Sequence, residues 1–575
     1  MALFGVHRMI RISLVSGALC ALPLLAGAQP AQTIYTGGDI LTMEGATPRY
    51  AQALAVRDGR IVRVGSRSAV MALKGAQTQV VELGGRTLIP GFVDSHSHLS
   101  DYAGSLEQGN LNPPPIGKVE RIADIITEMK ALKARLNAPA GTLLVGSGYD
   151  QDLLAEKRHP TAADLDSAFP DEPVVLRHAS GHMLVANTAA MKRVGISAAT
   201  PDPEGGTILR KPGSKEPEGL MQEMAMQAFM PMLTAPRPIE KEFELLKRAQ
   251  QHYAQFGVTT AADHLIMEDR LPVMEEAIRN KQFFIDVVAA PAFIYANKVV
   301  GTGRIRWGEY DNHLKWGGLK IAVDGSPQGK TAFVSQTYLT PVPGCEKDCK
   351  GFPNLNQKQV DGLLQLAYKN GVQIYSHANG DAAVDMMIRG HEQAVAAVGG
   401  PKKDHRTLII HSQIIRPDQL DAYKRLGLLP TFFSAHTHYW GDVHLANLGA
   451  QRAGFISPLA SANRKGVIHG NHTDTIVTPI DQMALLWTAV NRVSRTGQVV
   501  GASERVSPYQ GLKAQTANGA YLYFEEKTKG TLTQGKLADL VILDRNPLKV
   551  PPASIRDIKV LETIKEGQTV FRAGS

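Results

Sequence analysis

Two histidines separated by one serine end an early apolar run of the chain. The segment GFVDSHSHLS, residues 91–100, contains His96 and His98. Because successive side chains of a β-strand point to opposite faces, the two imidazoles project to the same side. They are therefore able to share one divalent cation, but a single His-x-His pair fits an ordinary polar loop equally well. The rest of the sequence must decide between these interpretations.

Further residues of metal-binding type occur at the ends of later apolar runs. The candidate ligands are His96, His98, Lys320, His377, His411 and Asp474. Neutral imidazoles and carboxylates bind zinc and related divalent ions, and two ions need more than four protein groups. A buried lysine shifts its pKa readily, and a neutral amine can take up carbon dioxide, so a carbamylated Lys320 would offer two oxygens that bridge two metals. Each residue alone also fits a structural role, whereas all six together favour a metal site.

The apolar runs must form the strands that bring these residues to one edge. We predict eight strands, at residues 91–98, 258–264, 283–290, 318–325, 372–380, 407–413, 428–435 and 467–474. Amphipathic helical segments between several of them end near a glycine, as helix C-termini often do. This alternation predicts an α/β fold with a (β/α)8 TIM-like barrel, whose active site lies at the carboxyl ends of the strands. An open doubly wound sheet is the alternative.

The two ends of the chain differ from its middle. Residues 29–90 and 526–575 read as short strands with alternating apolar residues between glycine-containing turns, which predicts one small composite β-sandwich domain built from both ends. Residues 91–525 form the predicted barrel. Within it, residues from about 100 to 240 are too many for one βα connection, so we interpret them as an inserted cap subdomain over the barrel mouth.

Residues 1–28 have the features of a secretory signal peptide. His7, Arg8 and Arg11 precede an apolar run at residues 14–25, and the small residues Ala-Gly-Ala follow it. An uncleaved membrane anchor is the alternative, but the run is short for a membrane span. We therefore expect a periplasmic or secreted protein that has no stable membrane insertion after signal cleavage.

Composition narrows the classes of function. The chain has 575 residues, of which 43% are hydrophobic and 20% charged, as is usual for a globular protein. Its formal charge of +8 falls to +6 when the signal takes away Arg8 and Arg11, and the scattered basic residues give no support for nucleic-acid binding. Cys345 and Cys349 are the cysteines left after cleavage. In an exported protein this close pair predicts a disulfide in preference to a metal pair.

The chain resembles the amidohydrolase superfamily, and within it the amidohydrolase 3 group, which includes N-substituted formamide deformylases. The resemblance runs from about residue 33 to the C-terminus, and the motifs that carry it are IPGFVDSHSHL, SGHMLVAN, GVTTAADH, LKIAVDGSPQGKTA, SHANGDAAV, IIHSQ, HTDTIVTP and GKLADLVILD. It implies a metal-dependent hydrolase on a distorted (β/α)8 barrel with a composite β-sandwich. It also implies ligand roles for the six residues identified above. One departure is His472 in Asn-His-Thr-Asp, where many relatives have Gly-Ser-Asp, so this extra imidazole is a candidate for metal or substrate contact.

The leading functional hypothesis is hydrolysis of a non-peptide C–N bond, such as an N-acyl or N-formyl amide, by metal-activated water. Asp474 would deprotonate the water and pass the proton to the leaving amine, and His182 in SGHMLVAN would stabilise the oxyanion. Ester or lactone hydrolysis at the same site is one alternative. A non-catalytic secreted binding protein is another.

Substrate contacts and cofactors complete the expectation. The candidate substrate-binding residues are His182, His438, Trp440 and His472. His438 and Trp440 follow the seventh predicted strand and would therefore lie near the mouth. We expect one or two divalent ions, with zinc as the first candidate, and a small-molecule substrate. The sequence leaves open whether the chain forms a homo-oligomer.

Overall fold

The structure is a computed structural model that describes residues 29–574, apart from residues 115, 235, 343 and 400–403. The predicted signal peptide, residues 1–28, lies outside the described residues. Among the residues described, no helix has both the length and the apolar character needed to cross a membrane.

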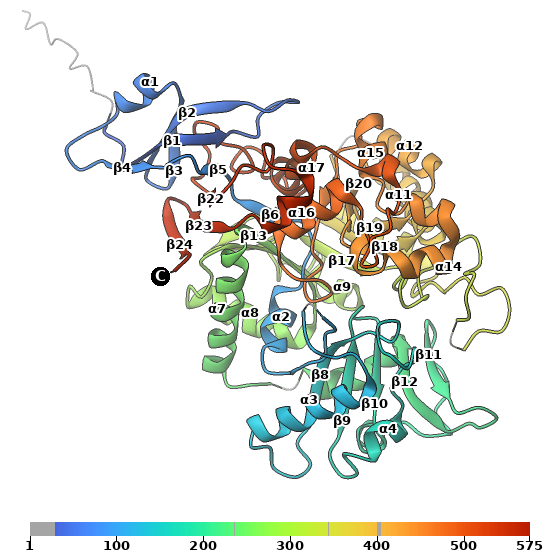
Figure 1. Ribbon diagram of the computed structural model, residues 1–575. Coiled ribbons are helices and arrows are strands. Elements are labelled where there is room, and N and C mark those ends of the chain that lie inside the picture. Colours follow the sequence, from blue (N-terminus) through green and yellow to red (C-terminus); the bar gives the residue numbers. More distant parts are fainter. Residues whose placement is uncertain (1–28, 115, 235, 343, 400–403, 575) are drawn as a thin grey trace, which may run out of the picture.

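Strands from both ends of the chain form one eight-stranded sheet. In Figure 1 the blue strands of the N-terminal part lie beside the red strands of the C-terminal part. The sheet order is β24-β23-β22-β5-β1-β2-β3, with β4 added beside β1. The strands are β1 (Thr33–Leu41), β2 (Tyr50–Arg57), β3 (Arg60–Gly65), β4 (Gln79–Glu82), β5 (Thr87–Pro90), β22 (Leu540–Leu543), β23 (Val560–Lys565) and β24 (Gln568–Arg572). The two ends join where β5 pairs antiparallel with β22, and the division into domains remains a prediction.

All eight predicted strands of the middle region are present. They are β6 (Phe92–Asp94), β13 (Val258–Ile266), β14 (Asp286–Pro291), β17 (Gly318–Ala322), β18 (Gln373–Gly380), β19 (Leu408–Ile414), β20 (Leu429–Phe432) and β21 (Gly470–Asn471). They belong to two five-stranded sheets, ordered β15-β16-β14-β13-β6 and β17-β18-β19-β20-β21. Apart from the hairpin of β15 (Tyr310–Asp311) with β16 (Leu314–Trp316), neighbouring strands pair in parallel. The middle of the chain therefore has an α/β fold.

One stretch of chain takes part in both sheets. Strand β16 pairs with β14, and after Gly317 the chain continues as β17, which pairs with β18. Gly317 is required at this break, because a Cβ there would lie 2.4 Å from the hydroxyl oxygen of Tyr375. On the opposite side, the backbone N–H of Asp474 donates to the carbonyl of His96 at 3.1 Å, just beyond β21 and β6. These connections bring the strand ends with the candidate ligands toward one another.

Amphipathic helices pack against these strands. Helix α7 (Ile239–Gln255) buries Leu245, Leu246 and Ala249 in the main hydrophobic core. Other helices of this region are α8 (Leu271–Arg279), α10 (Gln357–Lys369), α11 (Asp381–Ala397), α12 (Pro417–Leu426) and α16 (Gln482–Asn491). Burial of one apolar face in each helix supplies the main driving force for this packing.

A third sheet lies within the region predicted as an insertion. Its order is β11-β12-β10-β9-β8-β7. The strands are β7 (Gly109–Asn110), β8 (Leu144–Tyr149), β9 (Val174–His178), β10 (Met183–Ala186), β11 (Gly206–Arg210) and β12 (Pro217–Glu223). This sheet, drawn in blue-green in Figure 1, packs with α3 (Ile122–Arg135) around a core of its own. The 3-10 helix η1 (Met224–Phe229) and helix α6 (Met230–Leu233) follow directly after β12.

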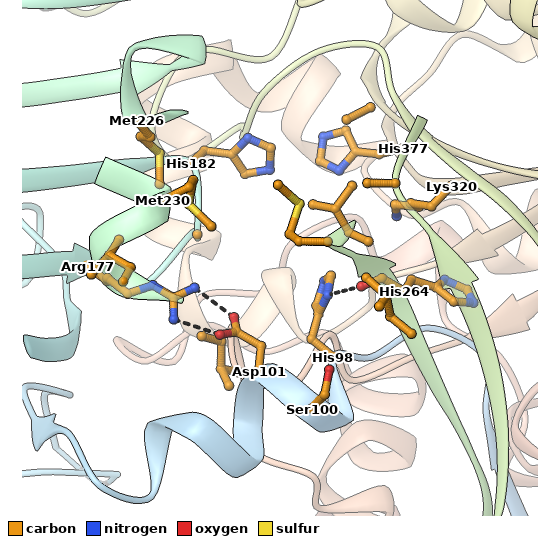
Figure 2. Close-up of a pocket in the computed structure, with 18 of the residues that line it drawn as sticks. His98, Ser100, Asp101, Arg177, His182, Met226, Met230, His264, Lys320 and His377 are labelled. Carbon is orange, nitrogen blue, oxygen red and sulfur yellow. Dashed lines mark hydrogen bonds and ion pairs between the residues drawn. The ribbon is translucent and has the colours of Figure 1, made fainter. Parts of the chain in front are cut away.

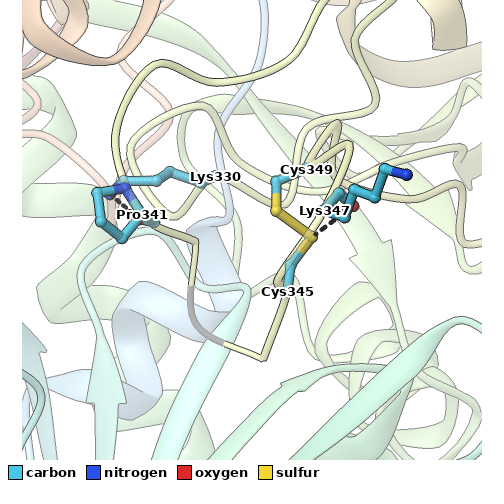
Figure 3. Close-up of a disulfide and its surroundings, with 5 residues drawn as sticks. All are labelled: Lys330, Pro341, Cys345, Lys347 and Cys349. Carbon is cyan, nitrogen blue, oxygen red and sulfur yellow. Dashed lines mark hydrogen bonds between the residues drawn. A yellow bond between two sulfur atoms is a disulfide. The ribbon is translucent and has the colours of Figure 1, made fainter.

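The loop between β17 and α10 contains the expected disulfide. Cys345 and Cys349 are bonded, with their Cα atoms 5.8 Å apart (Figure 3). In the same loop, the Nζ of Lys330 donates to the carbonyl of Pro341 at 2.6 Å. The disulfide and this hydrogen bond each join residues that are close in sequence, so both stabilise the loop locally.

Candidate metal centre

The two histidines after β6 converge on one carboxylate. The Nε2 atoms of His96 and His98 lie 3.1 and 3.4 Å from Oδ1 of Asp474. The Nδ1 of His98 donates to the carbonyl of His264 at 2.8 Å, and the Nδ1 of His96 lies 2.8 Å from the Nδ1 of His264. The hydrogen bond to the carbonyl of His264 selects the neutral tautomer of His98 with its proton on Nδ1. The lone pair on Nε2 of His98 then points toward Asp474. A lone pair facing a carboxylate is the arrangement that a shared cation stabilises.

The remaining candidate ligands join the same cluster. The Nζ of Lys320 on β17 lies 3.4 Å from the Nε2 of His96. His411 and His377 come from the neighbouring strands β19 and β18, and their Nε2 and Nδ1 atoms are 2.9 Å apart. The Nδ1 of His411 also lies 3.8 Å from Oδ2 of Asp474. The structure thus brings together all six candidate ligands.

His472 lies against this cluster but does not line the cavity. Its ring centre is 5.0 Å from those of both His96 and His411, and it stacks on Phe433. Asp474 belongs to two groups of three residues whose ligand atoms all lie within 4.8 Å of one another. One group is His96, His98 and Asp474, and the other is His411, His472 and Asp474. The position of His472 therefore fits a ligand better than a substrate contact.

Several polar atoms of the cluster are buried without a hydrogen-bond partner. They are Nδ1 of His411, Oδ1 of Asp474 and both ring nitrogens of His472. Leaving such an atom without a partner costs about 1–3 kcal/mol, so the cluster is unfavourable unless something binds to it. Imidazole nitrogens and carboxylate oxygens are the donors that zinc-like divalent ions prefer. The residues present therefore fit a divalent metal.

Burial sets the charges in the centre. It lowers the pKa of Lys320 to about 7, so the neutral amine that carbamylation requires is populated near neutral pH. Burial alone would raise the pKa of Asp474, but the nearby imidazoles of His96 and His411 lower it well below its usual value. Asp474 is therefore ionised, and it supplies the negative charge that a cation needs.

His182 from the inserted sheet reaches the edge of the cluster. Its ring centre lies 4.7 Å from that of His377 (Figure 2). The Nδ1 of His182 is 2.8 Å from Oε2 of Glu223, which also accepts a hydrogen bond from Asn354 at 3.1 Å. Burial would lower the pKa of His182, but Glu223 outweighs burial and raises it. His182 therefore has the orientation and proton that a hydrogen-bond donor at this site needs.

Comparison with known proteins identifies the family. Residues 79–571 match the Amidohydrolase family. The chain belongs to this family. Membership supports an enzyme that hydrolyses carbon–nitrogen bonds, in agreement with the resemblance found in the sequence.

Individual relatives cover nearly the whole chain. The N-substituted formamide deformylase of Arthrobacter pascens is 26% identical over 91% of this chain and 96% of its own. Protein LONG AFTER FAR-RED 3 of Arabidopsis thaliana is 29% identical over 90% and 88% of the two chains. The crystal structure of an uncharacterized metal-dependent hydrolase from Pyrococcus horikoshii covers 90% of this chain and 99% of its own, with 24% identity and a TM-score of 0.70. At that identity, this structural match shows a shared fold.

The metal centre of this amidohydrolase opens into a cavity of about 270 Å³. The candidate ligands and His182 line one side of the cavity, and residues of the inserted region line another (Figure 2). The figure shows Met226 and Met230 beside His182, with Arg177 and Asp101 paired below them. The inserted region therefore contributes both a candidate catalytic residue and a wall of the cavity.

Two predicted substrate contacts lie elsewhere. His438 donates from Nδ1 to the carbonyl of Val493 at 2.9 Å, and the indole of Trp440 donates to Asp150 at 2.5 Å. Neither residue lines the cavity of the amidohydrolase. The structure places both side chains outside the cavity in which we expected them, because the chain turns into helix α13 (His436–Tyr439) after β20 and directs them into packing contacts.

Two residues of the site were missed in the sequence. His264 ends the motif GVTTAADH on β13 and orients both His96 and His98, and its strand-end position was the available signal. Glu223, the partner of His182, is the last residue of the largely buried strand β12, and the sequence gives no local signal for its role.

Proposed function

We propose that this protein is an exported, metal-dependent amidohydrolase that cleaves the C–N bond of a small N-acyl or N-formyl amide. The observation that carries the proposal is the buried group of unpartnered imidazole and carboxylate atoms beside His182. Similarity to a protein named N-substituted formamide deformylase supports the choice of bond. The protein is proposed to cleave this bond with an activated water molecule.

The residues that would hold the metal are His96, His98, Lys320, His377, His411 and Asp474, with His472 as a further neighbour. Zinc is the first candidate, and the site has enough donors for one or two ions. A bound divalent ion would supply Lewis-acid activation of the attacking water and of the scissile carbonyl.

The chain's own groups would move the protons. Oδ1 of Asp474, which is ionised and unpartnered, would accept a proton from the attacking water and then transfer it to the leaving nitrogen. The Nε2–H of His182 would donate to the carbonyl oxygen as negative charge develops there. Glu223 would hold His182 in position through Nδ1.

A substrate panel tests the proposal. Purified protein reconstituted separately with Zn, Mn and Co is assayed on N-formyl amides, N-acyl amino acids and lactones. We expect hydrolysis of an amide. His411→Asn should abolish both this activity and metal binding, whereas the control variant His438→Gln should retain both. Turnover of lactones or esters alone would favour the ester hydrolase. Failure to bind any of the three metals, together with no turnover, would favour a non-catalytic binding protein.

We further propose that residues 1–28 direct export to the periplasm or the outside of the cell. The charged, apolar and small-residue segments of the N-terminus support this, as does the Cys345–Cys349 disulfide, which is typical of oxidising compartments. Sequencing the mature N-terminus tests it, with a start near Gln29 expected and an intact Met1 contradicting it.

For the fold, we propose that the two five-stranded sheets form one distorted (β/α)8 barrel with a composite β-domain and an inserted cap. The shared β16–β17 stretch and the backbone hydrogen bond between Asp474 and His96 support closure on both sides. An experimental structure in which β21 and β6 separate would contradict it.

A further inference from the structure

We infer that the substrate carries, beside its scissile amide, both a bulky apolar group and a carboxylate. The inference rests on the proposed function and specifies the chemical class of the substrate. Two features of the cavity carry it. One is a wall of methionines, and the other is a group of arginines around helix α2 (Leu99–Ser105).

The methionine wall is contributed by the segment that follows β12. Met224 and Met226 of η1 and Met230 of α6 line the cavity, and Ile266 and Phe293 line it as well. Methionine is unbranched and polarizable, so such a wall adapts to the shape of an apolar group. Binding of an apolar group against this wall removes apolar surface from water, which makes binding more favourable. A substrate with an apolar body would therefore bind here more tightly than a small polar amide.

The backbone of Glu223 fixes the start of this wall. Glu223 is a non-glycine residue with φ of +50°, a strained conformation at the junction of β12 and η1. Its N–H donates to the carbonyl of His182 at 3.0 Å, and its side chain accepts from Nδ1 of the same residue. The conformation that orients His182 thus also determines where the methionines begin, so the reacting amide and the apolar group would be positioned together.

The arginines leave one positive charge without a carboxylate of its own. Arg177 forms a bidentate pair with Asp101, with N–O distances of 2.8 and 2.7 Å. Arg270 forms a second bidentate pair with Glu242, at 2.7 and 2.8 Å. Arg237 has only a 3.6 Å contact with an oxygen that Arg270 already uses, and its side chain is 31% exposed. Three guanidinium groups therefore form ion pairs with two carboxylates, and the buried Asp263 adds a further negative charge near Arg270.

A carboxylate on the substrate would give Arg237 a close ion-pair partner. Arg177, Arg237 and Arg270 all line the same cavity as the metal ligands and the methionines. A guanidinium and a carboxylate form strong, charge-assisted hydrogen bonds, and an enclosed cavity screens them less than open solvent does. The fitting compounds are N-formyl or N-acyl derivatives of amino acids that have a large apolar side chain.

Four amides test the two features separately. They are N-formylphenylalanine, N-formylphenylalaninamide, N-formylglycine and N-formylglycinamide. For the metal-reconstituted enzyme we expect kcat/KM for N-formylphenylalanine to exceed that of each of the other three at least tenfold. Equal values across the four, or a preference for the carboxamides, would overturn the inference.

Matched variants assign each preference to its residues. Met230→Gln should reduce the preference for phenylalanine over glycine at least fivefold, and Arg237→Gln should do the same to the preference for carboxylate over carboxamide. The controls are Met232→Gln, on the same helix but outside this cavity, and Arg248→Gln, on α7 and paired with Glu244. The inference fails if Met230→Gln and Arg237→Gln behave like these controls.

Calorimetry on metal-free protein separates this inference from the proposed function. If no amide is hydrolysed, the proposed function fails, but binding of the four compounds still tests the cavity. We expect N-formylphenylalanine to bind at least tenfold more tightly than N-formylglycinamide, and Arg237→Gln to remove most of the carboxylate preference. Binding that does not discriminate among the four would overturn the inference.

Discussion

Two buried polar clusters of this protein are built in opposite ways. The metal centre gathers imidazoles, one lysine and one carboxylate, with several atoms unpartnered. The second cluster, which we call the ion network, contains Lys315, Lys529, Lys565, Asp286, Glu525 and Asp539. In the ion network every lysine lies within ion-pair distance of a carboxylate, and its residues connect β14 and β16 with the composite sheet.

The lysines of the two clusters show the difference most clearly. Lys529 contacts Asp286 and lies 3.0 Å from Glu525; burial would lower its pKa, but these carboxylates raise it. Lys320 is equally buried but has an imidazole as its hydrogen-bonding neighbour, and burial lowers its pKa to about 7. With two carboxylate partners Lys529 is a stable cation, whereas Lys320, which has none at hydrogen-bonding distance, is available for chemistry; Lys315, with Glu525 as its one partner, has a lowered pKa. The pairing of buried charges therefore distinguishes a structural cluster from a functional one.

The strongest test of this distinction is Asp474→Asn. The variant should lose about 10³-fold in kcat/KM, because general acid–base catalysis by a positioned side chain contributes about 10²–10⁴-fold. The free energy of unfolding of the metal-free protein should change less than in a variant of the ion network, since the groups that face Oδ1 of Asp474 at 3.1 and 3.4 Å are imidazoles and not lysine ammonium groups. Steady-state kinetics, metal analysis and urea unfolding measure these quantities. Full turnover with metal still bound would remove Asp474 from its proton-transfer role.

Asp286→Asn in the ion network should give the opposite result. Removing one partner of a buried ion pair costs about 3–5 kcal/mol of unfolding free energy, because Lys529 and Lys565 lose a shared carboxylate. The kcat/KM of the folded fraction should stay within about twofold, as this cluster does not line the cavity. Urea unfolding with Asp311→Asn, an exposed aspartate, as control tests it. Unchanged stability would show that the ion network does not support the fold.

Zinc should stabilise the protein through the metal centre alone. A ligand that binds only the folded state, at a free concentration 100-fold above its Kd, raises the free energy of unfolding by about 2.7 kcal/mol. Asp286, His313 and Glu566 also lie close together, but Lys565 is 2.9 Å from both carboxylates and would repel a cation. Thermal unfolding should therefore show zinc stabilisation that His411→Asn removes and His313→Asn retains. Loss of the effect in His313→Asn would instead place metal at the group of Asp286, His313 and Glu566.

His391, a buried histidine outside both clusters, should make the free energy of unfolding depend on pH. Burial, with a smaller contribution from His405, lowers the pKa of His391 to about 4, and its Nδ1 pairs with the hydroxyl of Tyr368. Below pH 6.5 the unfolded chain binds a proton at this position that the folded protein does not bind, so stability falls as the pH falls. From pH 6.5 to 5 the loss is about 2 kcal/mol. His391→Gln should remove this part of the pH dependence in urea unfolding, and an unchanged slope would contradict it.

The sequence predicted the strands and the convergence of the candidate ligands better than the positions of His438 and Trp440. His96, His98, His377 and His411 come from regular strand ends, whose alternation fixes where a side chain points. His438 and Trp440 follow a strand that turns at once into a short helix, and the direction of side chains after such a turn depends on tertiary packing.

The pairing of His182 with Glu223 could not be predicted from the sequence, for a related reason. Glu223 lies 41 positions from His182, and the two meet only because β10 and β12 pair antiparallel in the inserted sheet. The arginine group has the same origin, since Arg177 meets Asp101 across 76 positions. Contacts of this length follow from topology, which local patterns do not encode.

The break at Gly317 has a mechanical consequence. Lys320 lies three residues beyond it, on a strand whose first half is hydrogen-bonded to one sheet and whose second half to the other. If the two sheets slide past each other, Lys320 must shift relative to His96, which belongs to the first sheet, or to His377, which belongs to the second. The continuous chain from β16 to β17 therefore ties the two halves of the candidate metal centre to one another, so a shift between the sheets would change the spacing of its ligands.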